Sequence, residues 1–202
     1  KAAHFVPDAV TVRYLEQRDG DAPHSIAPIT TDADGYAEWL AIDVGAVESL
    51  VACPHSPANV RPVREAGEVA LDQVYIGSCA GGRLEDFAIS ATLLNGRRVA
   101  PRLKVVAVPS SVAVMRQAMA LGYLQVLLDA GVCVSNPSCG ACGGIDKGVL
   151  AAGDVSLMTS TRNFQGRLGP RDTAVYLAST ATCAASALRG RLTPPEEIWE
   201  GR

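Results

Sequence analysis

The chain is poor in several features that define large classes of protein. Of its 202 residues only 5% are aromatic and 3 are histidine, and the 18 basic residues are outnumbered by 21 acidic ones. Because the basic residues form no run, composition gives no electrostatic reason to expect nucleic acid or an anionic membrane as the main partner. Charged residues interrupt every apolar stretch before it reaches the roughly 20 residues that span a bilayer. We therefore expect neither nucleic-acid binding nor a membrane span.

A secretory signal and low-complexity tracts are also not recognisable in the chain. It has 48% hydrophobic residues, enough for a real core, and six cysteines: Cys53, Cys79, Cys133, Cys139, Cys142 and Cys183. Cysteines in a chain of this size without a signal peptide favour free thiols in a reducing cytosol over a disulfide framework. We expect a cytoplasmic protein, and one that has been processed or trimmed, because it begins with Lys1 and not with methionine.

The hydrophobic pattern divides the chain into an irregular and a regular part. Residues 1–45 contain a short amphipathic stretch at 10–15 and then turn residues such as Asp32-Ala33-Asp34-Gly35. They lack the periodicity of an independent domain, so we interpret residues 1–45 as a connecting arm that lies on another surface. Residues 46–202 are interpreted as one domain.

This second part alternates between strand and helix patterns. Short apolar runs predict buried strands at 47–52, 73–76, 104–108 and 155–159. Helical periodicity predicts helices at 84–94, between a Ser110 or Ser111 cap and Gly122, and over the alanine-rich stretch 172–188. Strand and helix in alternation predict an α/β sheet.

Cys79 stands at a predicted strand-to-helix turn, Gly77-Ser78-Cys79-Ala80-Gly81-Gly82-Arg83. In open α/β sheets such turns face the ligand crevice, and helix-terminal N–H groups there favour an anion such as a thiolate. A small buried cysteine in a glycine-rich turn is an equally good interpretation of this motif alone.

Cys139 and Cys142 form a C-x-x-C pair in a loop with glycines on both sides. Half of a zinc site, a redox dithiol and an iron–sulfur ligand pair all use this spacing. A zinc ribbon needs a second cysteine or histidine pair, and His4, His24 and His55 have no suitable spacing to the loop. Three cysteines on two segments suit a cluster with three thiolate ligands and one open iron.

Two arginines follow the strand predicted at 155–159. Arg162 and Arg167 lie five residues apart in a polar loop. Guanidinium groups bind carboxylates in bidentate geometry, so the pair indicates a di- or tricarboxylate ligand. Taken alone, the loop is better explained as a solvated basic surface, but its nearness in sequence to the cysteine loop weakens that interpretation.

Taken in order, these motifs resemble the aconitase and isopropylmalate dehydratase superfamily. The matching residues are Gly77-Ser78-Cys79-x-x-Gly82-Arg83, then Cys139-x-x-Cys142-Gly143, then Ser160-x-Arg162-Asn163-Phe164-x-Gly166-Arg167. The stretch Cys53-Pro54-His55-Ser56-Pro57-x-Asn59-Val60 is similar to the segment before the first ligand in the isopropylmalate dehydratase and homoaconitase branch. The resemblance covers about residues 47–188 and implies the three-layer α/β/α sheet of the aconitase iron–sulfur domain.

The resemblance also implies roles for the site residues. Cys79, Cys139 and Cys142 would ligate a [4Fe–4S] cluster whose fourth iron is a Lewis acid. Arg162 and Arg167 would hold substrate carboxylates, while Ser78 and Asn163 would hydrogen-bond the cluster and its ligands. The implied reaction is a hydro-lyase reaction on a 2-hydroxy di- or tricarboxylate of the isopropylmalate, homocitrate or dimethylmalate type. The alternative is a non-catalytic metal or iron–sulfur module with a structural or regulatory role.

Three positions depart from the family pattern. Ala80 and Gly81 follow the first cysteine where the family commonly has threonine and asparagine, and Thr161 replaces the asparagine that commonly precedes the arginine. We expect different hydrogen bonds near the cluster. The remaining thiols, Cys53, Cys133 and Cys183, match no motif and are interpreted as core or surface residues.

The resemblance further implies that other chains complete the site. The acid/base residues of an N-terminal half and the proton-abstracting serine of a swivel domain are not recognisable here. Family large subunits are about twice this length, so we interpret the chain as their C-terminal, cluster-bearing half. We expect an N-terminal-half polypeptide and a small swivel subunit as partners, a small carboxylate as substrate, and no activity from this chain alone.

Overall fold

The computed structural model describes residues 7–17 and 37–199 and separates the chain into two units, Lys1–Ala46 and Val47–Arg202. In the first unit, helix α1 (Ala9–Glu16) contains the amphipathic stretch noted above, and the Asp8 side chain caps it by accepting a hydrogen bond from the Thr11 N–H at 2.8 Å. A 3-10 turn, η2, covers Val44–Ala46. The turn expected at 32–35 lies outside the described residues, and the connecting-arm interpretation stays a prediction.

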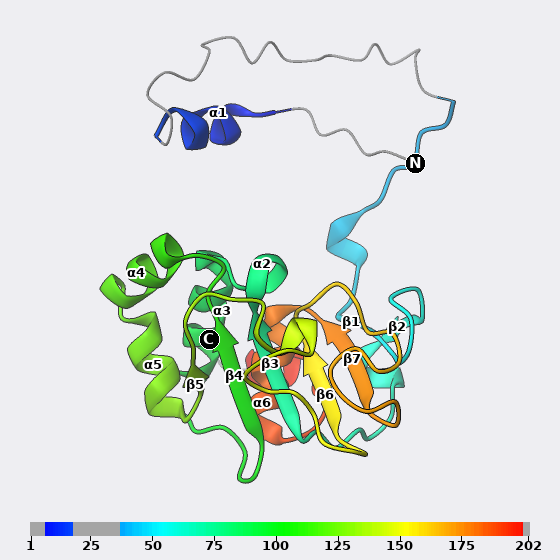
Figure 1. Ribbon diagram of the computed structural model, residues 1–202. Coiled ribbons are helices and arrows are strands. Elements are labelled where there is room, and N and C mark those ends of the chain that lie inside the picture. Colours follow the sequence, from blue (N-terminus) through cyan, green and yellow to red (C-terminus); the bar gives the residue numbers. More distant parts are fainter. Residues whose placement is uncertain (1–6, 18–36, 200–202) are drawn as a thin grey trace. The chain divides into compact units, whose positions relative to one another are not determined.

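The second unit is built on a mixed sheet of seven strands in the order β2-β1-β7-β6-β3-β4-β5 (Figure 1). Strands β3 to β7 pair in parallel, whereas β1 runs antiparallel to both β2 and β7. This confirms the α/β class. The strands are β1 (Leu50–Ala52), β2 (Val60–Pro62), β3 (Gln73–Gly77), β4 (Lys104–Val108), β5 (Cys133–Val134), β6 (Val155–Met158) and β7 (Ala174–Ala178).

The helices begin and end largely where capping residues predict. The Ser111 side chain accepts a hydrogen bond from the Val114 N–H at 3.2 Å, and Gly122, with a φ of 77°, separates α4 from α5. The helices of this unit are α2 (Ser78–Gly81), α3 (Leu84–Leu94), α4 (Val112–Ala120), α5 (Tyr123–Ala130), α6 (Thr180–Arg189) and α7 (Glu196–Trp199), with 3-10 turns η3 (Val63–Glu65) and η4 (Gly140–Gly143).

The continuous helix expected over 172–188 is wrong in its first half. Residues 174–178 form strand β7, and the helix, α6, begins only at Thr180. The physical reason is the alternation of this segment: Val175 and Leu177 pack on one face of the sheet, and Tyr176 packs on the other. Ser179 then caps α6 by accepting a hydrogen bond from the Thr182 N–H at 3.2 Å.

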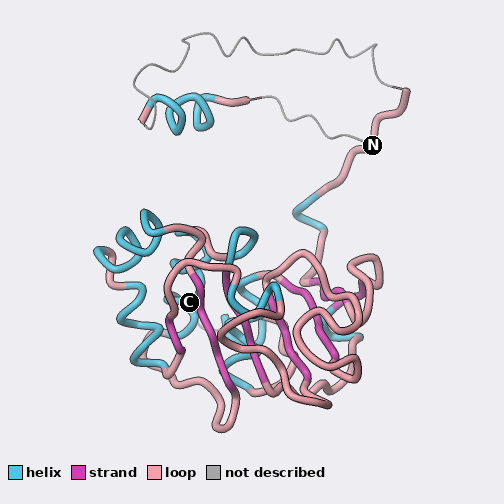
Figure 2. The backbone as a smooth tube through the Cα atoms, viewed as in Figure 1, coloured by secondary structure: helices cyan, strands magenta, loops and turns pink. Residues whose placement is uncertain are grey.

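The two faces of the sheet are covered by different kinds of structure. On one face, Val74, Ile76 and Leu157 pack against helical residues such as Phe87 and Leu127. On the other face, the buried cluster comprises strand residues and residues of η4 and the adjoining loops: Ala52, Tyr75, Val106, Val108, Ala141, Leu150, Met158, Leu168, Val175 and Leu177. Figure 2 shows these loop segments crossing the strands. The candidate site therefore lies on a loop-covered face.

In the part of the chain that the structure describes, no helix has both the length and the apolar character that a membrane crossing requires.

Candidate functional site

The residues singled out in the sequence lie at the carboxyl ends of parallel strands. Cys79 follows β3 within two residues, Ser160 follows β6, and the loop that carries Cys139 and Cys142 follows β5. Parallel strands place their carboxyl ends at the same edge of a sheet, where open α/β folds bind ligands. Figure 1 shows α2 and η4 at that edge.

The turn that carries Cys79 is tight because Gly77 lies against strand β4. A Cβ atom on Gly77 would stand 2.8 Å from the Val108 backbone nitrogen, and the φ and ψ of Gly77 are 152° and −157°. Only glycine adopts this conformation without strain. Ser78 follows with a φ of 59°, also rare for a side-chain-bearing residue. The backbone thus turns sharply and leaves Cys79 exposed.

Thr159 connects this turn to the neighbouring strand. Its hydroxyl accepts a hydrogen bond from the Gly77 N–H at 2.9 Å. The same side chain lies so close to Gly81 that a Cβ atom at Gly81 would collide with it. Glycine at position 81, one of the departures from the family pattern, is therefore required by the observed placement of Thr159.

The C-x-x-C loop lies on Tyr75, a buried residue in the middle of β3. The Tyr75 hydroxyl donates a hydrogen bond to the Cys139 carbonyl oxygen at 2.9 Å. The Cys142 N–H donates to the same carbonyl at 3.0 Å and closes the η4 turn. Sequence analysis did not identify Tyr75, because a strand residue that points into the core carries no motif of its own.

Cys142 is half-buried and has polar neighbours. Its Sγ lies 3.0 Å from Ser160 Oγ and 3.9 Å from an Arg167 guanidinium nitrogen. Burial alone would raise the pKa of the Cys142 thiol, but the neighbouring Ser160, Arg167 and Ser78 side chains outweigh it and lower the pKa below its ordinary value. These surroundings lower the cost of forming the thiolate, which is the form of cysteine that binds metal.

The two arginines are placed differently. The Arg167 guanidinium stacks 5.4 Å from the centre of the Phe164 ring and reaches toward Cys142. Arg162 is exposed and makes no ion pair or hydrogen bond with the residues that the structure describes. One guanidinium is thus held beside a thiol, and the other is open to solvent and to ligands.

Asn163 donates its amide hydrogens to backbone carbonyls and not to a thiol. Its amide nitrogen donates hydrogen bonds to the Cys53 and Val175 carbonyl oxygens, at 2.9 and 3.1 Å. Both amide hydrogens are therefore used to attach the arginine loop to β1 and β7. A hydrogen bond from Asn163 to a thiolate would require breaking one of them.

The three cysteines do not form a site for a single metal ion in the described residues. Within the described residues, no three histidine, cysteine or carboxylate side chains lie close enough to bind one metal ion. The pKa of the Tyr75 hydroxyl is raised by its burial and by the charges of Cys142, Cys139 and Cys79. Ligands of a four-iron cluster bind separate irons and so stand farther apart than ligands of one ion.

Buried polar groups around these thiols lack partners. In the described part of the chain, Ser78 Oγ and Arg167 Nε are buried without a hydrogen-bond partner of good geometry. Buried polar atoms are normally satisfied, and exceptions often mark a missing ligand or ion. Such unsatisfied donors next to cysteines are suited to an anionic iron–sulfur cluster, because its sulfurs can accept hydrogen bonds from them.

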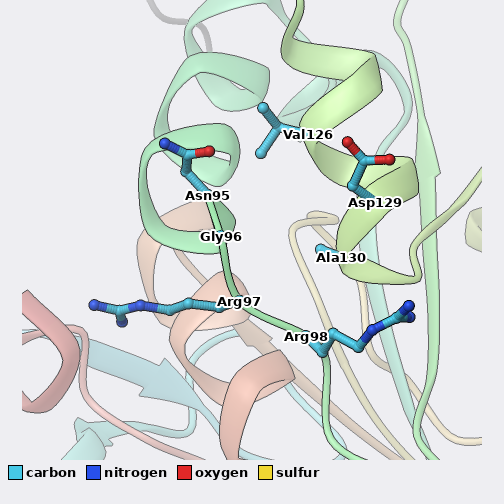
Figure 3. Close-up of a pocket in the computed structure, with 7 residues that line it drawn as sticks. All are labelled: Asn95, Gly96, Arg97, Arg98, Val126, Asp129 and Ala130. Carbon is cyan, nitrogen blue, oxygen red and sulfur yellow. The ribbon is translucent and has the colours of Figure 1, made fainter.

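Two surface hollows lie outside the cysteine set. One adjoins the Cys79 turn and is lined by small and polar residues: Ala80, Gly81, Asp86, Ile89, Thr159, Ala178, Ser179, Thr180 and Ala181. The other lies between α3 and α5, at the opposite end of the sheet (Figure 3). Its two arginines, Arg97 and Arg98, extend in opposite directions and do not converge on one ligand. Only the first hollow is continuous with the candidate site.

The fold and the site together define an α/β domain that presents three free thiols and two arginines at the carboxyl edge of a mixed sheet. Residues 65–190 match the model of the family described as "Aconitase family (aconitate hydratase)". The chain belongs to the aconitase family, which confirms the resemblance seen in its motifs.

Curated relatives narrow the likeness to one branch. The 3-isopropylmalate dehydratase large subunit of Sulfurisphaera tokodaii is 44% identical over 197 residues, 98% of this chain and 46% of the relative. Large subunits of the same name from Pyrobaculum arsenaticum and Syntrophus aciditrophicus are 45% and 42% identical, each over 96% of this chain and 46% of the relative. The chain therefore spans about half the length of the curated relatives it matches.

Proposed function

We propose that this chain forms the cluster-bearing part of an aconitase-family hydro-lyase that acts on a 2-hydroxy dicarboxylate of the isopropylmalate type. The observation that carries the proposal is the placement of Cys79, Cys139 and Cys142 on segments that follow strands of one parallel set, with Arg167 reaching the Cys142 thiol. The relatives' name supports the substrate class. The length of those relatives supports the view that this chain supplies only part of the active site.

The three cysteines would hold a [4Fe–4S] cluster. Such a cluster, when bound, supplies an open iron that acts as a Lewis acid on a hydroxyl group. The chain's own residues prepare the place: Ser160, Arg167 and Ser78 lower the pKa of the Cys142 thiol, and the buried Ser78 hydroxyl makes no hydrogen bond of good geometry to the residues that the structure describes.

The arginine loop would bind the substrate. Arg162 presents an exposed guanidinium that can grip a carboxylate in bidentate geometry. Asn163, between Arg162 and Phe164, hydrogen-bonds the Cys53 and Val175 backbone carbonyls. These bonds hold the backbone of the loop from which both arginine side chains extend. Arg167, stacked on Phe164, would bring a second positive charge between the thiols and the substrate.

The proposed enzyme needs further chains. We propose an N-terminal-half polypeptide and a small swivel subunit as partners, because no proton-abstracting base has been identified among this chain's site residues. The relatives are named large subunits, which is consistent with a heteromer. A cytoplasmic location is supported by six cysteines that are all unpaired.

Metal analysis tests the cluster. After anaerobic reconstitution, the chain should bind about four irons with acid-labile sulfide and absorb broadly in the visible range. Cys139→Ser should lower iron occupancy, whereas Cys133→Ser, which changes an exposed cysteine outside the site, should not. Zinc in place of iron, or full occupancy in Cys139→Ser, would contradict the ligand assignment and favour a non-catalytic module.

Turnover tests the arginine loop. In the complex reconstituted with the partner chains, Arg162→Ala should raise the KM for the dicarboxylate and leave the iron content unchanged. Arg64→Ala is a suitable control, because Arg64 is an exposed arginine whose guanidinium pairs with Glu48. Unchanged turnover in Arg162→Ala would remove that side chain from the substrate site.

A further inference from the structure

Strand β3 contacts both cysteine-bearing segments of the candidate site. Cys79 follows its last residue by two positions, and Tyr75, in its middle, touches the C-x-x-C loop. Tyr75 is fully buried, packed on the loop-covered face of the sheet with Val106, Val108 and Ala141. A single strand therefore determines where two separate groups of thiols lie.

The loop approaches the Tyr75 side chain as closely as a backbone can. Gly140 has a φ of 50°, and a Cβ atom there would stand 2.9 Å from the Tyr75 hydroxyl oxygen and 3.4 Å from Val108 Cγ2. The ring thus determines the height of the loop above the sheet. The hydrogen bond to the Cys139 carbonyl, at 2.9 Å, determines its position along the strand.

The Cys139 carbonyl also governs the spacing of the two loop thiols. It accepts a hydrogen bond from the Cys142 N–H at 3.0 Å in addition to the one from Tyr75. Loss of the Tyr75 hydroxyl would leave one lone pair of this carbonyl without a protein donor and free the turn to shift.

We propose that Tyr75 is a positioning residue whose hydroxyl, through the Cys139 carbonyl, holds the C-x-x-C loop and its two thiols in place on strand β3. Tyr75 does not ligate iron and does not touch the substrate. It acts through the backbone of a ligand-bearing loop. The effect on the cluster rests on the proposed function. The placement of the loop can be tested in the apoprotein, without a cluster.

The experiment compares Tyr75→Phe with Tyr176→Phe in the full chain. Phenylalanine keeps the ring and removes only the donor, and Tyr176 is a strand tyrosine that packs on the opposite face of the sheet. In the apoprotein, alkylation of Cys142 should be about fivefold faster in Tyr75→Phe, the effect of losing one neutral hydrogen bond. Alkylation of the exposed Cys133 and of the buried Cys183 should not change, which shows that the fold is intact.

The reconstituted protein provides the second measurement. Loss of visible absorbance to an iron chelator should be about fivefold faster in Tyr75→Phe than in the unmodified chain and in Tyr176→Phe. Equal rates of Cys142 alkylation in the three proteins would overturn the inference, whatever the cluster does. Faster Cys142 alkylation in a chain that takes up no iron would support the placement of the loop and overturn the proposed function instead.

Discussion

Replacement of Gly77 by alanine tests the account of the Cys79 turn. Gly77 has a φ of 152° and a ψ of −157°, a combination that is essentially restricted to glycine. An added Cβ would also stand 2.8 Å from the Val108 nitrogen and 2.9 Å from Val108 Cβ. Neither neighbour is the end of a flexible side chain, so the two paired strands β3 and β4 would have to separate.

The magnitude follows from these two contributions. Backbone strain at such a conformation costs about 1–3 kcal/mol, and forcing an extra methyl group into a packed core costs about 1–3 kcal/mol. We expect Gly77→Ala to lower the free energy of unfolding by about 4 kcal/mol. Gly67 is the matched control, because it has a φ of 80° with no atom near its Cβ position. In Gly67→Ala the only penalty is the left-handed backbone conformation, so the free energy of unfolding should fall by about 1 kcal/mol.

Urea unfolding followed by circular dichroism measures both variants. The slope of the free energy against urea should be the same in all proteins, so that the midpoint reports stability. A difference between Gly77→Ala and Gly67→Ala of less than about 1 kcal/mol would refute the reasoning. It would mean that the strands yield easily and that the turn does not require glycine.

Three further predictions concern the core around the site. Thr159→Val, which keeps the shape but leaves the Gly77 N–H without its acceptor, should cost about 1–3 kcal/mol in urea unfolding. Leu157→Ala, in the fully buried centre of β6, should cost about 2–5 kcal/mol in the same assay. Burial raises the pKa of the Cys183 thiol, so above about pH 8.5 only the unfolded thiol ionises and the free energy of unfolding falls as pH rises. Cys183→Ala should make that fall shallower. An unchanged slope of the free energy of unfolding against pH would contradict the role given to Cys183.

The fold was predictable where the apolar pattern is strong. Strands β3 and β4 and helix α3 occupy the ranges expected from their apolar runs and helical periodicity. The error at 172–188 arose because alanine favours helices locally, whereas Val175 and Leu177 are placed in a strand by the space between β6 and β1. That space is set by distant residues, which no local pattern encodes.

The site was predictable as a set of motifs but not as a set of contacts. Cysteine spacing pointed to three thiols and an arginine-rich loop after a strand pointed to two guanidinium groups, whose roles stay predictions. The hydrogen bonds of Tyr75 and Thr159 were not visible, because each joins segments more than sixty residues apart. Asn163, expected beside the thiolates, instead bonds backbone carbonyls of two other segments.

The unsatisfied groups of the site link cluster binding to the stability of this unit. Within the described residues, Ser78 Oγ and Arg167 Nε are buried without partners, and each such group costs about 1–3 kcal/mol. A ligand that accepts their hydrogen bonds recovers this energy only in the folded state, so it must stabilise folding as it binds. A cluster held by three thiolates stabilises the folded state in any case, so only the part of the gain that is lost in Ser78→Ala reports a hydrogen bond from that hydroxyl. An equal rise of the unfolding midpoint on reconstitution in Ser78→Ala and in the unmodified chain would show that Ser78 does not donate to the cluster.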